Sequence, residues 1–84
     1  MGLHLDPDPD DSYQRVPPAV ARWADRVFDW LEETPTNTHA QQHPFTIGVW
    51  AVRARIGGDD WLILWERDGP DVVVRYLDVD MLNR

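Results

Sequence analysis

The segment that most constrains the fold of this chain is Trp61–Arg67, because its apolar residues do not alternate with polar ones. It begins Trp-Leu-Ile-Leu-Trp before its first charged residue. A strand with apolar side chains on both faces needs cover on both sides, as a central strand has. Gly57-Gly58-Asp59-Asp60 and Asp68-Gly69-Pro70 are turn sequences on either side of it. We therefore predict a central strand that is joined to both of its neighbours by tight turns.

The two neighbours also have strand-like sequences. Phe45–Ile56 is rich in β-branched and aromatic residues, and Val72–Leu77 forms a second such run. In the first run, one face of the strand is apolar and carries Trp50, Val52, Ala54 and Ile56. Arg53 and Arg55 alternate with these residues, so the two arginines fall on the other face. These three strands predict an antiparallel meander in the second half of the chain, followed by a polar tail over residues 78–84.

The first half favours helices. Leu3–Leu5 suits a short strand, and Asp8 is a candidate cap for a brief helix that ends near Arg15. The clearest helix is predicted over residues 18–33, where one stripe is apolar. Its members are Val20, Trp23, Val27, Trp30 and Leu31. Together these patterns predict one α+β domain over residues 1–84, with the order β-α-α-β-β-β and helices on one face of a three- or four-stranded sheet.

Composition excludes several classes of protein. Fifteen acidic residues against eight arginines give a net charge of −7, and the chain has neither lysine nor cysteine. Such an acidic chain is not expected to bind nucleic acid directly. The lack of cysteine excludes a disulfide scaffold, a Cys-ligated zinc site and a thiol nucleophile. No apolar run has the length of a membrane helix and the first residues do not resemble a signal peptide, so we expect a cytoplasmic protein.

The residues predict no metal site, cofactor or catalytic group. The acids from Asp6 to Asp11 begin like a calcium loop, but that loop needs glycine and glutamate where this chain has Asp11 and Pro17. His39 and His43 are four residues apart, yet they lie in a polar loop without an evident third ligand. Ser12 is the one serine, and no histidine stands at a spacing typical of a catalytic triad.

The tryptophans allow two interpretations. Trp61 and Trp65 share one face of the central strand and Trp50 is on the next strand, so they could form a platform on which bases stack. The alternative is a sheet face that is buried under the helix carrying Trp23 and Trp30. The acidic net charge favours the second interpretation.

Several short motifs, in their order and spacing, support a resemblance to a known family. They are Val16-Pro17-Pro18, Leu31…Pro35, Gly48…Trp50-Ala51…Arg53, Gly58…Trp61–Trp65, Asp68-Gly69 and Val72–Arg75 before a tail that ends in Arg84. Over nearly its whole length the chain resembles the RelE/ParE superfamily of toxin–antitoxin toxins. The resemblance implies the same β-α-α-β-β-β fold. It also implies an antitoxin partner and one of two activities, which are messenger-RNA cleavage in the ribosomal A site and poisoning of DNA gyrase.

The chain departs from the cleaving branch of that family at three positions. Leu62 stands where the family commonly has an arginine, Asp78-Val79 where it often has a His-Arg pair, and Asn83 where a tyrosine often occurs. Leucine donates no hydrogen bond, and Asp78 would repel a phosphate. The resemblance therefore implies the scaffold, while these residues predict that RNA cleavage has been lost.

Two hypotheses about function remain open at this point, beside a ribonuclease that survives on the remaining arginines and a plain folded domain. In the first, the chain is a RelE/ParE-like protein that binds an antitoxin-like partner, with gyrase or the ribosome as targets by family analogy. Its candidate partner-binding residues are Arg53, Arg55, Arg75 and Arg84. In the second, it is an acidic phage or mobile-element protein that blocks a basic host surface. The acidic face of that hypothesis consists of Asp6, Asp8, Asp10, Asp11, Asp29, Glu32 and Glu33.

Overall fold

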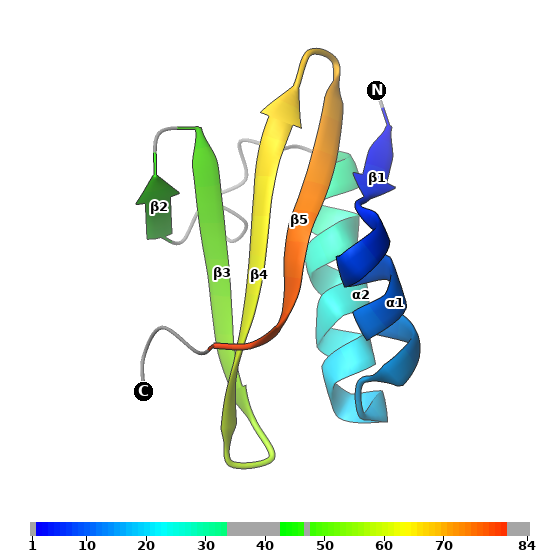
Figure 1. The fold of residues 1–84 in the computed structure, drawn as a ribbon, viewed down its shortest axis with the longest axis vertical. Helices are drawn as coiled ribbons and strands as arrows, with labels where there is room; N and C mark the ends of the chain where they lie inside the picture. Colours follow the sequence, from blue (N-terminus) through cyan, green and yellow to red (C-terminus); the bar gives the residue numbers. More distant parts are fainter. Residues whose placement is uncertain (1, 34–42, 47, 81–84) are drawn as a thin grey trace.

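A short strand and two helices precede four strands in this chain (Figure 1). The computed structural model describes residues 2–33, 43–46 and 48–80. The elements are β1 (Leu3–Leu5), α1 (Pro7–Arg15), α2 (Pro18–Glu33), β2 (His43–Thr46), β3 (Val49–Ile56), β4 (Asp59–Asp68) and β5 (Asp71–Val79). The predicted α+β class is confirmed, and so is the predicted helix over residues 18–33.

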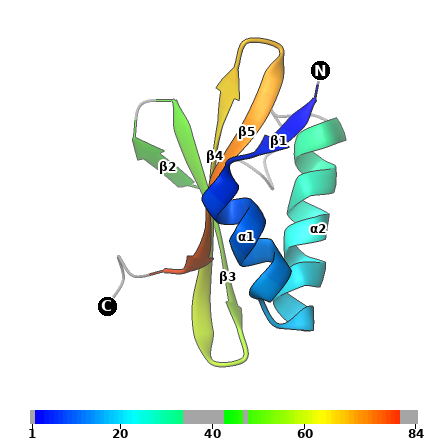
Figure 2. The same cartoon turned by 45° about the vertical axis from the view of Figure 1, so that its right-hand side comes forward.

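The strands form one mixed sheet in the order β1-β5-β4-β3-β2, with β4 in the middle as predicted. β3, β4 and β5 are the expected antiparallel meander. β1 pairs in parallel with the start of β5, which joins Leu3 to Val72 and Leu5 to Val74. Figures 1 and 2 show both helices on the same side of the sheet, with α1 beside β5 beyond the end of β1.

The sheet has five strands because the single strand predicted over Phe45–Ile56 is in fact two. Gly48 separates β2 from β3 with a φ of +81°, a left-handed conformation that glycine adopts without a steric penalty. The chain reverses there, and β2 pairs antiparallel with β3. An edge strand thus begins at His43, although His43 was predicted to lie in a loop.

The first helix begins earlier than predicted. Its N-cap is Asp6 rather than Asp8, and its first turn contains Pro7 and Pro9. Proline is tolerated there because the first amide groups of a helix have no partner within the helix. The Asp6 side chain makes no capping hydrogen bond and instead contacts Arg75 of β5. The predicted end of this helix at Arg15 is confirmed.

The core lies between α2 and the sheet. The stripe of α2 that packs inward is Val20, Ala24, Val27, Phe28 and Leu31. It meets a sheet face that includes Val52, Ile63, Trp65, Val74 and Leu77. Trp65 is fully buried and Trp61 nearly so, so these rings are not available for stacking on bases. The interpretation of a sheet face covered by the helix is therefore confirmed.

The end of the meander differs from the prediction. Residues from Asp78 onward were expected to be a polar tail, but β5 continues to Val79, and Asp80 is buried. In both views the described end of β5 crosses the β3–β4 hairpin (Figures 1 and 2). None of the helices in the described ranges is long and apolar enough to cross a membrane.

We expect Leu31→Ala to lower the free energy of unfolding by about 3 kcal/mol, because it leaves a cavity under the last turn of α2. Leu31 is fully buried, whereas its neighbour Glu32 is exposed. The control, Glu32→Ala, is expected to change stability by less than about 0.5 kcal/mol. Urea unfolding followed by tryptophan fluorescence measures both variants. Equal effects of the two substitutions would contradict the position of α2.

Candidate functional site

The arginines that were predicted to bind a partner lie on the sheet face opposite the helices. Arg53 and Arg55 flank Ala54 on β3, on the face opposite the core residue Val52. Arg75 reaches that face through an irregularity in β5, where Leu64 pairs with Tyr76 and Trp65 pairs with Val74. Arg75 is thus the extra residue of a β-bulge, and its side chain lies beside Glu66 of β4. Arg84, the fourth candidate, lies outside the described residues.

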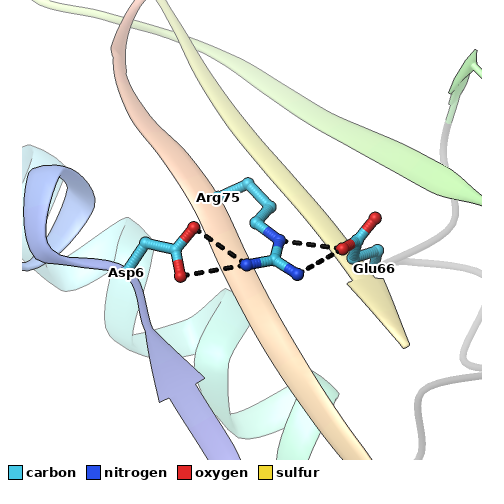
Figure 3. Close-up of polar contacts among 3 residues, drawn as sticks. All are labelled: Asp6, Glu66 and Arg75. Atoms are coloured by element: carbon cyan, nitrogen blue, oxygen red, sulfur yellow. Dashed lines mark hydrogen bonds and ion pairs between the residues drawn. The ribbon is translucent and has the colours of Figure 1, made fainter. Parts of the chain in front are cut away.

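Arg75 holds together three elements of the fold (Figure 3). Its Nε–H donates to Glu66 Oε1 at 2.8 Å, and its Nη1 donates to both oxygens of Asp6 at 3.1 Å. The hydrogen bonds to Glu66 and then to Asp6 raise the pKa of the Arg75 guanidinium above its usual range. Two carboxylates therefore already neutralise this cation within the chain.

Arg53 makes an ion pair with a buried carboxylate. Its Nε–H donates to Asp80 Oδ2 at 2.9 Å, and the Asp80 side chain is wholly inaccessible to solvent. The Asp80 amide donates to the carbonyl oxygen of Asp60 at 2.7 Å. β4 lies between β3 and β5, so the pair reaches across β4 on the face that carries Leu62. Leu62 is only 1% exposed, although no helix of the described residues covers that face.

Arg55 is held much more loosely than the other two. Its Nη1 lies 3.7 Å from Asp60 Oδ1, and its Nη2 donates to the Gly58 carbonyl oxygen at 3.4 Å. The Arg55 side chain is 72% exposed. Exposed pairs at such distances contribute little to stability. Among the three described candidates, Arg55 is the one whose guanidinium is most open to another molecule.

The seven acids of the alternative hypothesis come from different parts of the fold and differ in their contacts. Asp6 pairs with Arg75, and Asp11 pairs with Arg15 one turn later in α1, at 2.9 Å. The other five side chains are exposed on the two helices. They are Asp8 and Asp10 in the first turn of α1, and Asp29, Glu32 and Glu33 in the last turns of α2.

A polar groove runs between α1 and β5. Its larger part has a volume of about 300 Å³ and its smaller part about 160 Å³. Ser12, Arg15 and Asp78 line both parts, which makes the groove continuous. Asp8 lies at one end and Trp61 at the other. The sequence patterns did not indicate this groove, because the residues of α1 and β5 that line it are sixty or more residues apart in the chain.

The structure describes two of the three positions that argued against RNA cleavage. Leu62 is buried in the sheet, and Asp78 is exposed on β5 beside it. Asn83 and the tail around it lie outside the described residues, as does His39. Among the described side chains, no three carboxylates or histidines are grouped so as to hold a metal ion.

Two tyrosines have raised pKa values for different reasons. The Tyr13 hydroxyl donates to Asp25 on α2, and this hydrogen bond raises the pKa of Tyr13 above its ordinary 10.0. Burial raises the pKa of Tyr76, whose hydroxyl donates to the Val79 carbonyl oxygen at 2.7 Å. Both contacts need the neutral phenol. Their contribution to stability is therefore complete below pH 10 and is lost as the pH rises through the folded-state pKa values.

We expect the tyrosinate absorbance of the folded protein to appear above pH 10, since both phenols are held in the neutral form. Asp25→Ala should lower the pKa of Tyr13 toward its ordinary value and leave that of Tyr76 unchanged. A spectrophotometric titration of both proteins measures the two ionisations. Identical titration curves would show that Asp25 does not hold the Tyr13 hydroxyl.

We expect Arg53→Met to lower the free energy of unfolding by about 3 kcal/mol, because it leaves the Asp80 carboxylate buried without its cation. The double variant Arg53→Met/Asp80→Leu should recover most of that loss. Arg55→Met is the matched control, with an expected change below about 0.5 kcal/mol. Urea unfolding of the four proteins measures the coupling, and equal effects at Arg53 and Arg55 would contradict it.

Comparison with known proteins leaves the fold as the established result. No protein-family model, curated protein or solved structure matches this chain. The chain is a small α+β domain with two N-terminal helices and a C-terminal sheet, and the described residues of that sheet carry an ion-paired face and a polar groove.

Proposed function

We propose that this protein is a RelE/ParE-like member of a toxin–antitoxin system that acts by binding a protein partner and does not cleave RNA. The proposal combines the motifs that resemble that superfamily with the observed order of helices and strands. The claim that the protein does not cleave RNA rests on the ion pairs of the arginines on the sheet face opposite the helices. A cleaving enzyme needs cations there that are available to a phosphoryl group.

Two of the three described arginines on that face are occupied by the chain's own carboxylates. Arg75 pairs with Asp6 and Glu66, and Arg53 pairs with Asp80. Leu62 supplies neither a charge nor a hydrogen-bond donor where the family commonly has an arginine. A negatively charged RNA backbone would also have to approach a chain with a net charge of −7. These features support binding of a protein over chemistry on RNA.

An antitoxin-like protein is the proposed partner, and the four candidate arginines remain its proposed contacts. Arg55 is the best placed of those in the described residues, because its guanidinium is largely exposed and its internal contacts are long. By family analogy, gyrase or the ribosome is the proposed target. Contact with either one would be made by a protein surface rather than by a reactive group.

The second candidate function is that of an acidic protein that blocks a basic host surface. The observation in its favour is that Asp29, Glu32 and Glu33 are exposed together in the last turns of α2. Binding through such acids should weaken steeply as salt is added. Partner binding that persists in high salt would favour the antitoxin-like partner instead.

Induced expression in a bacterium, with growth and transcript integrity followed together, tests the proposal. We expect transcripts to stay intact, both in the cells and when purified protein is added to a translation extract and messenger-RNA ends are mapped by primer extension. Cut transcripts would overturn the loss of ribonuclease activity. Growth arrest with intact transcripts would support a protein target.

Co-expression with the product of an adjacent small open reading frame tests the partner. We expect the two proteins to copurify, and Arg55→Ala to weaken the complex about fivefold through the loss of a charge-assisted contact. Arg67→Ala is the control, since Arg67 is also an exposed arginine on a strand of the meander. The absence of a complex would refute an antitoxin-like partner encoded there, and equal effects of the two variants would remove Arg55 from the interface.

A further inference from the structure

We propose that the groove between α1 and β5 receives a basic side chain, an arginine or a lysine, from an extended segment of the partner. This inference rests on the proposed function, because it assigns a surface and a chemistry to that partner. The groove is about 300 Å³ in its larger part and continues past Ser12 into a smaller hollow. It is therefore large enough for a long side chain and part of the backbone that carries it.

The two cations in the walls of the groove are already neutralised. Arg75 uses its Nε–H and its Nη atoms on Glu66 and Asp6 (Figure 3). Arg15 pairs with Asp11 at 2.9 Å, and its Nε–H lies within hydrogen-bond distance of the Asp11 carbonyl oxygen. Each guanidinium thus already has a carboxylate beside it, and a negatively charged occupant would meet that carboxylate as well.

Hydrogen-bond acceptors remain on both walls. Asp8 is exposed at the α1 wall, and Asp78 is exposed at the β5 wall, where its Oδ1 accepts the Val79 amide at 2.7 Å. Within the described part of the chain, no side chain donates to the second oxygen of Asp78 or to the carboxylate of Asp8. Ser12 adds a hydroxyl between them, in the stretch where the two parts of the groove meet.

This arrangement matches a cation with several donors. An arginine presents five N–H groups and a lysine three, and neither has an acceptor that would face the carboxylates. Asp78 also lies in one cross-strand row with Arg53, because Asp78 pairs with Leu62 and Leu62 pairs with Arg53. A partner segment that crosses this edge could therefore place a cation at Asp78 and an acidic or polar group near Arg55.

Amide NMR spectra of the full chain, titrated with the peptide acetyl-Gly-Arg-Arg-Gly-amide, test the groove without the natural partner. We expect shift changes confined to the groove walls, in the residues of α1 and in Arg75–Val79. Asp8→Asn/Asp78→Asn should weaken peptide binding about tenfold, since two charge-assisted contacts are lost. The control Asp59→Asn/Asp68→Asn removes two exposed acids elsewhere and should leave the affinity within about twofold.

Three outcomes would overturn the inference. They are shift changes spread evenly over all acidic surfaces, an equal loss in both double variants, and equal binding of acetyl-Gly-Glu-Glu-Gly-amide.

The copurified complex separates this inference from the proposed function. If the complex forms with wild-type protein and with Asp8→Asn/Asp78→Asn equally well, the partner stands and the groove is refuted. If no complex forms while the arginine peptide still binds the groove, the proposed partner fails and the groove stands.

Discussion

The burial of β4 on both faces is the constraint on which the rest of this structure depends. On one face, Ile63 and Trp65 meet α2, so a helix layer is required. On the other face no helix of the described residues is present, and Leu62 is nevertheless 1% exposed. On that face the Arg53–Asp80 pair joins β3 to the residue after β5, across β4. One face of β4 is thus packed against a helix, and the other is bridged by an ion pair.

Much of the fold could be predicted from local patterns. The helix over residues 18–33 has a full apolar stripe, and the Trp61–Arg67 run could only be a covered strand, so the class, the order and the central strand were correct. The patterns missed the break at Gly48, because a β-branched run on both sides of a glycine also fits one long strand. They missed the bulge at Arg75 as well, since a bulge is set by the pairing partner and leaves no local signature.

The candidate site was harder to predict, for a physical reason. Sequence reasoning placed Arg53 and Arg55 correctly opposite the apolar face, but it could not show which arginines were already paired. The partner of Arg53 is 27 residues away, and Asp6 is 69 residues from Arg75. Asp80 was predicted to be part of a polar tail, because an aspartate is rarely buried unless a cation pairs with it. Its cation, Arg53, lies on another strand, so the local sequence does not reveal the pair. Ion pairs between residues that are far apart in the sequence therefore determine which charged side chains stay open to a partner.

The parallel pairing of β1 with β5 has a consequence for the order in which this chain can fold. Leu3–Leu5 is synthesised well before Val72–Val74, the residues of β5 that it pairs with. The contact between Asp6 and Arg75 closes the same long loop. Such a loop has a high entropic cost and must wait for the late segment to leave the ribosome. The β3–β4–β5 meander, built from local hairpins, can assemble first, so β1 docks onto β5 only after the meander has formed.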